Sequence, residues 1–244
     1  MKNYQPEAIY YVVGNEQSLH FKQWIQVVEK MGYEWAGKLH HVPFGMMLKD
    51  GKKMSTRKGR VVLLANVLEE VIEMVKQNIE EKNPSLENKE AVAKAVGVGA
   101  VIFHDLKNFR LNDIEFSLEE MLNFEGETGP YVQYTFARIH SILEKQSFKE
   151  NESYKLAINE YEWTIYTQLV EFPTIIEKAY EQADPSLVAK YALKLARAFN
   201  KYYGNTKILA SDDFLNGRLA LCKSVEIVLK ESLRLLGIKA PKSM

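Results

Sequence analysis

The front of the chain shows two hydrophobic patterns in succession. Residues 8–14 form an unbroken run of mostly β-branched and aromatic side chains, which predicts a strand buried on both faces, as in a parallel sheet. Apolar residues then recur at helical spacing from Leu19 to Met31, and Gly32 is placed to end that helix. A second extended stretch is expected over 40–48. This order predicts an α/β unit, in which ligands gather at the carboxyl ends of the strands.

The middle of the chain changes to helical periodicity. The apolar run Val61–Leu64 predicts one more short strand. A helix is then expected with Asn66 as its N-cap, since Glu69 follows three residues later and apolar residues recur at helical spacing. The next segment, 89–107, predicts a helix rich in Ala and Gly. Its small side chains would let another element approach closely.

The back of the chain shows only helical signals. One helix is expected over Thr128–Glu144. Another begins at Asp184, an N-cap residue that is followed by Pro185 at the first helical position. The last is expected over Gly217–Leu236, with Gly237 in a Schellman-type stop. The pattern predicts an α/β front piece followed by an all-α helix bundle, with mostly α structure overall.

Composition places the chain among ordinary globular proteins. Its 244 residues are 46% apolar and 26% charged, which excludes a disordered or fibrous chain. The single cysteine, Cys222, excludes a disulfide scaffold and fits a reducing compartment. The N-terminal residues do not resemble a signal peptide, and the longest uncharged apolar run, 95–103, is too short for a membrane span. A cytoplasmic protein without membrane contact is expected.

The charges are unevenly distributed along the chain. Lys and Arg number 32, as do Asp and Glu, and a neutral total argues against a nucleic-acid binder. However, residues 1–60 hold 10 basic and 5 acidic residues, 61–126 hold 6 and 13, and 127–244 hold 16 and 14. The basic excess is concentrated in Lys49–Arg60. The neutral total therefore conceals a basic loop, an acidic connector and a mildly basic bundle.

The loop Gly51–Arg60 carries the strongest chemical signal. It has glycines near both ends, hydroxyls in the middle and five cations. Such a loop can close around a polyphosphate and stabilise the charge that develops on it in a transition state. It lacks the Gly-x4-Gly-Lys-Ser/Thr order of a P-loop. On charge alone a solvated basic turn is an equal alternative, but Met54 between Lys53 and Ser55 has no electrostatic purpose.

A second candidate surface lies on the helix expected over 128–144. Tyr131, Tyr134 and Arg138 are spaced i, i+3 and i+7 and therefore share one face. Aromatic rings beside a guanidinium suit the unstacked bases of single-stranded RNA. The alternative is an ordinary buried aromatic stripe, and the spacing alone favours that alternative.

Other residues that often carry chemistry receive structural interpretations. His40 and His41 are neighbours on an expected strand and point to opposite faces, so they cannot readily share a metal ion, and no metal site is expected. His20 follows Leu19 on an apolar helix, a setting typical of a structural histidine. Cys222 lies on a helix rich in Leu and Val and is expected to be a small core residue.

Several motifs in the same order resemble one family. Lys53-Met54-Ser55-Thr56-Arg57 resembles the Lys-Met-Ser-Lys-Ser signature of class I aminoacyl-tRNA synthetases, and with Lys58-Gly59 it resembles the form found in arginyl-tRNA synthetase. Further stretches agree with that family in the right order, namely 11–20, 41–46, 124–134 and 235–244. The resemblance covers essentially the whole chain.

The resemblance implies three regions and a reaction. Residues 1–80 would be the C-terminal part of a Rossmann-like class I catalytic domain, 81–125 a connecting, stem-contact region, and 126–244 an all-α anticodon-binding domain. The reaction is that of an arginine–tRNA ligase, which forms arginyl-adenylate from arginine and ATP and transfers the arginine to its tRNA. The implied partners are ATP, accompanied by Mg²⁺, arginine and the tRNA for arginine, without a protein-bound metal.

The resemblance also implies roles for residues of the front piece. Lys53, Ser55 and Arg57 would be catalytic, and Arg57 or Lys58 would partly fill the role of the second signature lysine, which is absent here. Gln17 matches a position that contacts the arginine substrate. The stretch 41–46 lies where the family holds adenine, mostly through main-chain atoms. The residues implied to bind ATP are His41, Phe44, Gly45, Met46, Lys53, Met54, Ser55 and Lys58.

In the bundle, the resemblance favours RNA binding over the buried stripe. The residues implied to receive the anticodon loop of the tRNA are Tyr131, Tyr134, Arg138, Tyr203 and Met244.

One family signature is missing from the sequence. No His-x-Gly-His occurs in the 244 residues. The chain is therefore expected to be a C-terminal portion of the enzyme that lacks the N-terminal half of the catalytic domain and does not form adenylate alone. A stand-alone tRNA-binding module without catalysis is the alternative, and a generic phosphate-binding protein is a weaker one. The full-length enzyme is expected to be monomeric, whereas this portion could self-associate through an exposed sheet edge.

Overall fold

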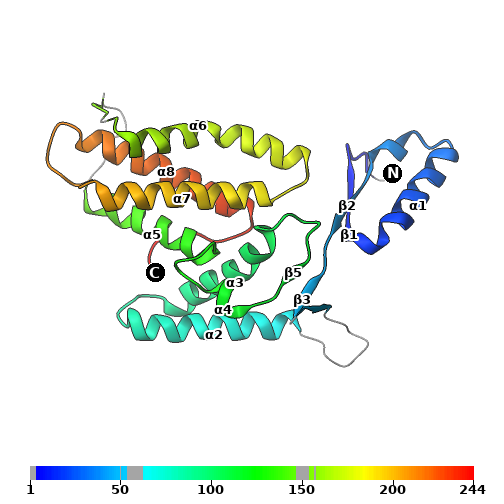
Figure 1. Ribbon diagram of the computed structural model, residues 1–244, viewed down its shortest axis with the longest axis horizontal. Helices are drawn as coiled ribbons and strands as arrows, with labels where there is room; N and C mark the ends of the chain where they lie inside the picture. The colour runs from blue at the N-terminus through cyan, green and yellow to red at the C-terminus, as the bar shows by residue number, and fades with distance from the viewer. Residues whose placement is uncertain (1–3, 50, 54–62, 147–153, 157) are drawn as a thin grey trace. The chain divides into compact units, whose positions relative to one another are not determined.

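The chain forms two compact units. One comprises residues 1–60 and 108–116, the other residues 61–107 and 117–244. The first contains the strands, and the regular elements among the described residues of the second are all helices (Figure 1), which confirms the predicted fold class. The functional division expected at residues 80 and 125 stays a prediction. The computed structural model describes residues 4–49, 51–53, 63–146, 154–156 and 158–244.

The first unit begins with a parallel strand pair and a helix. β1 (Ile9–Gly14) pairs with β2 (Leu39–Phe44), and short 3-10 turns, η1 (Asn15–Gln17) and η2 (Glu34–Lys38), flank α1 (Ser18–Lys30). Apolar side chains of α1, η2 and the strands form a small core. The helix ends where the sequence predicts, because the residue that follows its C-cap is Gly32 with φ of +79°, a conformation that glycine adopts readily.

The prediction that β1 is buried on both faces is wrong. Side chains alternate along a strand, and α1 covers one face of the pair. Ile9 and Tyr11 pack in the small core on that face, whereas Tyr10 is 50% exposed and Val12 is 65% exposed. The apolar run concealed this alternation because residues on both faces are β-branched or aromatic.

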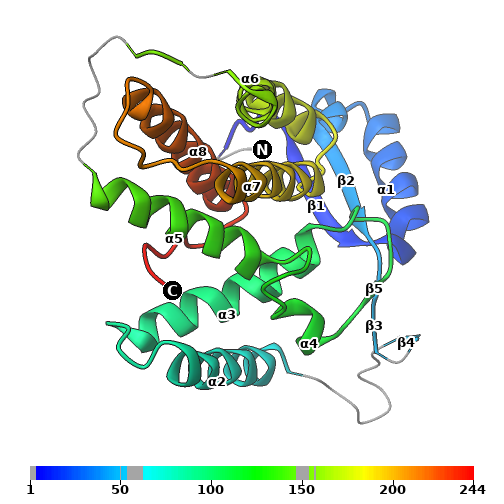
Figure 2. The same cartoon turned by 60° about the vertical axis from the view of Figure 1, so that its left-hand side comes forward.

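A second small sheet is formed by segments far apart in the sequence. β3 (Met47–Lys49) pairs antiparallel with β4 (Lys52–Lys53) and in parallel with β5 (Ile114–Glu115), as Figure 2 shows. The extended stretch predicted over 40–48 is thus confirmed as β2 and the start of β3.

The second unit begins with a helical hairpin. α2 (Leu64–Lys82) and α3 (Lys89–Leu106) lie side by side (Figures 1 and 2). The predicted close approach is confirmed, because a Cβ atom at Gly97 would lie 3.2 Å from the backbone of Ile72.

The predicted start of α2 is wrong. Leu63 is the N-cap, Leu64 is already helical and Asn66 lies in the first turn, so neither the expected strand at Leu63–Leu64 nor the expected cap is present there. A short apolar run does not distinguish a strand from the beginning of a helix. Val67 is buried on the helix, and its N–H donates to the carbonyl of Leu63 at 3.2 Å.

The remaining helices pack around the main core. They are α4 (Leu118–Met121), α5 (Gly129–Lys145), α6 (Glu160–Glu181), α7 (Ser186–Asn205) and α8 (Leu215–Leu235). α6 was not predicted; it has a capping box of Asn159 and Glu162 and contains Pro173. The core is built from apolar faces of α5, α7 and α8, with further side chains from α3 and α6.

The predicted Schellman stop after α8 is confirmed, whereas α7 begins one residue later than predicted, with Pro185 rather than Asp184 as its N-cap. Before α7, the Asp184 carboxylate accepts a hydrogen bond from the N–H of Ser186 at 3.0 Å. After α8, Gly237 has φ of +74°, and the N–H of Ile238 donates to the carbonyl of Leu233 at 2.8 Å. This pair of features is the Schellman motif.

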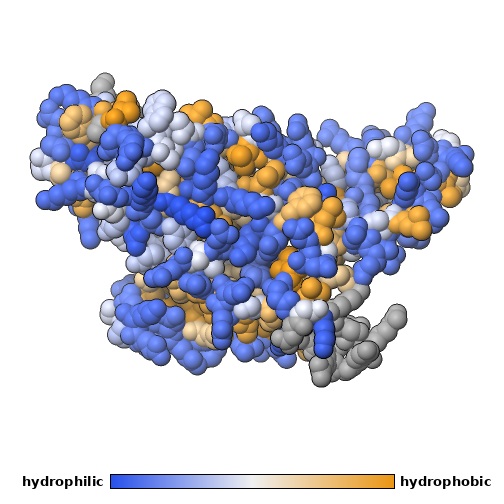
Figure 3. All heavy atoms as spheres, in the orientation of Figure 1, coloured by the Kyte–Doolittle hydropathy of each residue, from blue (hydrophilic) through white to orange (hydrophobic). Residues whose placement is uncertain are grey.

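The surface shows no extended apolar belt in the view of Figure 3. Hydrophilic side chains cover most of that face, with apolar side chains scattered among them. Among the described helices, none is long and apolar enough to cross a membrane.

Candidate functional site

The helical unit places a guanidinium between two aromatic rings. Arg138 on α5 lies with its Cζ atom 4.8 Å from the ring centroid of Tyr134 and 4.9 Å from that of Tyr203 on α7. The two tyrosines are 41% and 45% exposed, so their rings are accessible to a ligand. Arg138 also donates a hydrogen bond to the Oδ1 atom of Asn200. The helical spacing predicted the Tyr134–Arg138 face correctly, and α7 contributes a second ring to it.

A hydrogen-bond chain fixes this arrangement. Asn200 accepts from Arg138 and donates through Nδ2 to the hydroxyl of Thr135 at 2.8 Å. The Thr135 hydroxyl in turn donates to the carbonyl of Tyr131 at 2.9 Å. Because Asn200 is 62 residues from Arg138, sequence spacing offered no signal for it. The guanidinium is therefore held in one orientation beside the rings.

The start of α5 is fixed by a cap and by close packing. The Thr128 hydroxyl accepts a hydrogen bond from the N–H of Tyr131 at 3.3 Å. A Cβ atom at Gly129 would lie 2.8 Å from the carbonyl oxygen of Gly99. Only a glycine permits this approach of α5 to α3, so the Thr-Gly-Pro sequence sets where the helix begins and which face it presents.

Gln133 connects α5 with the C-terminal segment. Its side chain is fully buried, and Nε2 donates to the carbonyl of Ala95 at 3.1 Å and to the carbonyl of Lys239 at 2.7 Å. It was not among the predicted site residues, since a glutamine within a helix gives no specific signal. Its two bonds hold the segment that ends at Met244 against α3 and α5.

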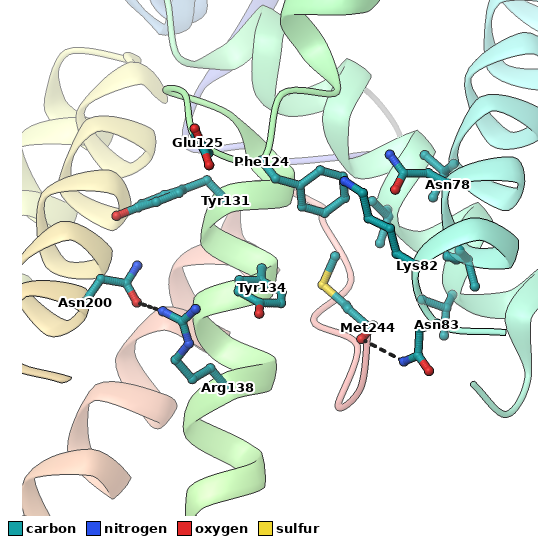
Figure 4. Close-up of a pocket in the computed structure, with 14 residues that line it drawn as sticks. Asn78, Lys82, Asn83, Phe124, Glu125, Tyr131, Tyr134, Arg138, Asn200 and Met244 are labelled. Carbon is teal, nitrogen blue, oxygen red and sulfur yellow. Dashed lines mark hydrogen bonds between the residues drawn. The ribbon is translucent and has the colours of Figure 1, made fainter. Parts of the chain in front are cut away.

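A cavity of about 710 Å³ lies between α5 and α2 (Figure 4). Tyr131, Tyr134, Arg138 and Met244, four of the five residues implied to face the anticodon, line it. The carbonyl of Met244 accepts a hydrogen bond of 3.4 Å from Nδ2 of Asn83, and Met244 packs on the apolar cluster of α2 and α3. The remaining lining residues are Val75, Asn78, Ile79, Lys82, Asn83, Val92, Val96, Phe124, Glu125 and Asn200.

An ion pair links the approach to α5 with α7. The carboxylate of Glu127 lies 2.7 Å from Nη2 of Arg197. The hydrogen bond and the charge of Arg197 lower the pKa of Glu127, so the pair is fully formed at neutral pH. Both side chains are exposed, which limits the contribution of this pair to stability.

In the first unit, the residues implied to bind adenine lie in a braced segment. The N–H of Gly45 donates to the carbonyl of Arg110 at 2.7 Å, and the N–H of Met46 donates to the carboxylate of Asp113 at 2.7 Å. The Met46 carbonyl accepts from the N–H of Ile114 at 2.8 Å. A side chain at Gly45 would overlap the carbonyl of Asn112. Any main-chain contact from this stretch to adenine must therefore use groups other than these two N–H groups.

His41 and Gln17 lie at different places in the first unit. The ring of His41 stacks on Phe21 of α1 with centroids 4.5 Å apart, and its Nε2 lies 3.0 Å from the carbonyl oxygen of Val13. Gln17 is exposed at the end of η1, which follows the carboxyl end of β1. Phe44, at the end of β2, is 43% exposed. Gln17 and Phe44 thus lie beyond or at the carboxyl ends of the two paired strands.

The structure describes the first residues of the basic loop, 51–53. The backbone of Lys53 lies in β4 opposite Leu48 of β3, so the first signature lysine follows a tight hairpin. Gly51 forms the turn of this hairpin with φ of +67°. The remaining residues of the signature and its extension lie outside the described residues, namely Met54, Ser55, Thr56, Arg57, Lys58 and Gly59.

The histidines and the cysteine lie in different surroundings. His40 stacks on Tyr10 and His41 on Phe21, on opposite faces of β2. His20 lies exposed on α1 with its ring edge toward Phe21. Cys222 is fully buried, and burial raises the pKa of its thiol to about 12. Within the described ranges, no group of three or more His, Cys, Asp or Glu side chains could hold a metal ion.

Two family models match the chain in succession. The model described as the class I tRNA synthetase (R) catalytic domain matches residues 1–118. The model described as the DALR anticodon binding domain matches residues 132–244. The first covers the strand pair and the small second sheet as well as α2 and α3, and the second covers most of α5 and all of α6 to α8.

Curated proteins and solved structures agree with these models. The chain is 60% identical over 235 residues to arginine–tRNA ligase 2 of Bacillus anthracis, covering 96% of this chain and 42% of that protein. It is 54% identical over 244 residues to the arginine–tRNA ligase of Exiguobacterium sibiricum, covering all of this chain and 43% of that protein. The arginyl-tRNA synthetase of Thermus thermophilus superposes with a TM-score of 0.87 at 34% identity, over 99% of this chain and 42% of that structure.

The chain thus spans about two fifths of the length of the relatives that it matches. Both family models, the high identity and the shared fold lead to the same assignment, and the chain belongs to the arginyl-tRNA synthetase family.

Proposed function

We propose that the helical unit binds the anticodon loop of the tRNA for arginine. The observation that carries this proposal is the Tyr134–Arg138–Tyr203 arrangement at the edge of a cavity. Exposed rings accept unstacked bases, and a fixed guanidinium adds a positive charge and hydrogen-bond donors beside them. An ordinary structural stripe would bury both rings, whereas these two are more than one third exposed.

The first unit would supply part of an ATP site. The resemblance assigns the phosphate-binding role to the loop that starts at Lys53, and mobile cations there would stabilise charge on the triphosphate. Mg²⁺ would accompany the nucleotide phosphates. The described residues offer no cluster that would hold the ion by themselves.

The complete activity would be that of an arginine–tRNA ligase, the name that the curated relatives carry. It joins arginine to ATP as arginyl-adenylate, releases pyrophosphate, and passes the arginyl group to the tRNA. The 244 residues contain no His-x-Gly-His. We therefore propose that this chain by itself does not catalyse the adenylate step. Arginine-dependent exchange of pyrophosphate into ATP by the purified chain, at the rate of a complete synthetase, would contradict this.

RNA binding is tested by filter binding with the tRNA for arginine. Loss of one base–ring stack is expected to cost about 1–3 kcal/mol, so Tyr134→Ala should weaken binding about 5- to 150-fold. Arg138→Ala should weaken it to a similar degree, because it removes both the charge and the support of the rings. Matched controls are Tyr180→Ala and Arg234→Ala, two exposed positions outside the cavity. Equal affinities for all four variants would reject the assignment.

The alternative is a stand-alone RNA-binding module that takes no part in catalysis. It shares the anticodon face and differs in the first unit. The module predicts that ATP does not bind to the chain, whereas the ligase portion predicts ATP binding that Lys53→Ala weakens. Equilibrium dialysis with ATP distinguishes the two.

A further inference from the structure

The cavity is lined on one side by residues implied to face the anticodon and on another side by helix α2, which we call the second wall. α2 contributes Val75, Asn78, Ile79 and Lys82 to the lining. These residues are spaced i, i+3, i+4 and i+7 and therefore lie on one helix face. Val75 is buried, Asn78 and Ile79 are partly buried, and Lys82 is exposed. The face thus changes from apolar to polar toward the end of the helix, where it lies opposite α5.

The polar end of this face offers unused hydrogen-bonding capacity. In Figure 4, Asn78 and Lys82 extend from α2 toward Phe124. The Lys82 ammonium lies 5.9 Å from the ring centroid of Phe124, and no carboxylate of the described residues pairs with it. The Asn78 amide likewise has no hydrogen bond to another described residue. Among the described residues, the Asn78 amide and the Lys82 ammonium thus line the cavity without a hydrogen-bonding or ion-pair partner, although Lys82 lies over the Phe124 ring.

Asn83 connects the end of α2 with the C-terminal residue Met244. Its Nδ2 donates to the Met244 carbonyl, and its Oδ1 accepts from the Ser85 hydroxyl at 3.2 Å. Met244 thereby lies between α2 and α5, as Figure 4 shows. The volume of about 710 Å³ is within the range of sites that enclose small organic ligands, about 300–1,000 Å³. The cavity is therefore large enough in volume for a ligand the size of a nucleotide.

We propose that the last turns of α2 form the second wall of the RNA site, which takes one unstacked nucleotide. Asn78 contacts the edge of its base, because a side-chain amide presents a donor and an acceptor side by side, as base edges do. Lys82 contacts a phosphate, because an ammonium provides donors and positive charge without an acceptor. Tyr134 supplies the ring surface on the opposite wall. This inference rests on the proposed binding of RNA and adds the residues that determine which base is accepted.

The test measures fluorescence anisotropy of a labelled anticodon stem-loop RNA from the tRNA for arginine. Binding is measured at several salt concentrations with wild type, Lys82→Met and the matched control Lys76→Met, which lies on α2 beside Glu90 and outside the cavity. A contact between Lys82 and a phosphate predicts that Lys82→Met lowers the slope of log affinity against log salt by about 0.7. Lys76→Met should keep the wild-type slope. A wild-type slope for Lys82→Met would contradict the proposal that the second wall contacts the RNA.

A second series uses stem-loops that each carry one changed base. Loss of a paired contact to a base edge changes discrimination by about 1–3 kcal/mol, or about 5- to 150-fold. Asn78→Ala should therefore erase the wild-type preference at one loop position and keep it at the others. A purely structural role for Asn78 would leave every preference unchanged, and that result would also overturn the second wall. Circular dichroism melts establish that each variant is folded.

The outcomes separate this inference from the proposed function. If Tyr134→Ala and Arg138→Ala weaken binding while Lys82→Met and Asn78→Ala behave as wild type, the RNA site stands and the second wall is wrong. If the wild-type chain does not bind the stem-loop at all, the proposed function fails and this inference fails with it.

Discussion

Replacing Gln133 by methionine tests how the C-terminal segment is attached to the helical unit. Methionine keeps the length and approximate volume of the side chain but removes both donors of Nε2. In the wild type these donors reach the carbonyls of Ala95 and Lys239 at 3.1 and 2.7 Å. The substitution therefore removes two hydrogen bonds with little change in packing, and it also removes the buried Oε1 atom, which accepts no hydrogen bond from the described residues.

The magnitude follows from what each carbonyl retains. A buried acceptor that loses its partner costs about 1–3 kcal/mol. Ala95 lies within α3, so its carbonyl keeps its helical partner and contributes little to the loss. Lys239 lies outside the helices, and Gln133 provides the hydrogen bond to its carbonyl. A decrease in the free energy of unfolding of about 1–3 kcal/mol is expected, mostly from this second carbonyl.

The assay is urea unfolding of the helical unit followed by circular dichroism, with Gln182→Met as the matched control. Gln182 is an exposed residue at the end of α6, where the same substitution should change stability by less than about 0.5 kcal/mol. RNA affinity should also fall for Gln133→Met, because the segment that carries Met244 loses one of its attachments. Stability within about 0.5 kcal/mol of wild type for Gln133→Met would refute the reasoning.

Three further predictions concern other parts of the chain. Gly45→Ala should unfold or loosen the first unit, because the added Cβ overlaps the Asn112 carbonyl, and faster amide hydrogen exchange of β3 would report this. Asp113→Ala should speed exchange of the Met46 amide, whereas Asp113→Asn should largely preserve protection because it keeps a side-chain oxygen as acceptor; equal exchange in both would contradict the assignment. Cys222 should not react with thiol reagents at pH 8 in the folded chain and should react in urea, since its pKa rises from 9.0 to about 12 on burial. Because the folded state then retains a proton that the unfolded state has lost, this thiol lowers the free energy of unfolding as pH rises from about 9 to about 12, which alkaline urea titrations would detect.

Local signals predicted the parts of the fold that local interactions decide. The start of α7 near Asp184 and the stop at Gly237 each depend on residues within a few positions, and each lies close to its predicted position. The predicted start of α2 was wrong, because the run before Asn66 contains no local feature that separates a strand from a helix.

The sequence predicted the side chains of the site that share a face of one helix, but it did not predict the contacts between helices. Spacing alone placed Tyr134 and Arg138 together on α5. Asn200, Gln133 and the α2 wall depend on contacts between segments that are distant in the sequence, and a single sequence does not reveal such pairs. The residues from Met54 to Lys58 carried the family resemblance and lie outside the described ranges, so their implied roles stay predictions.

The most direct test of RNA recognition compares two tRNAs that differ only in the anticodon. Dissociation constants of the wild-type chain and of Arg138→Ala are measured for the tRNA for arginine and for the same tRNA with a replaced anticodon. The wild-type chain should bind the tRNA with the arginine anticodon more tightly, and Arg138→Ala should lose most of this difference. Equal wild-type affinity for both tRNAs would contradict this prediction.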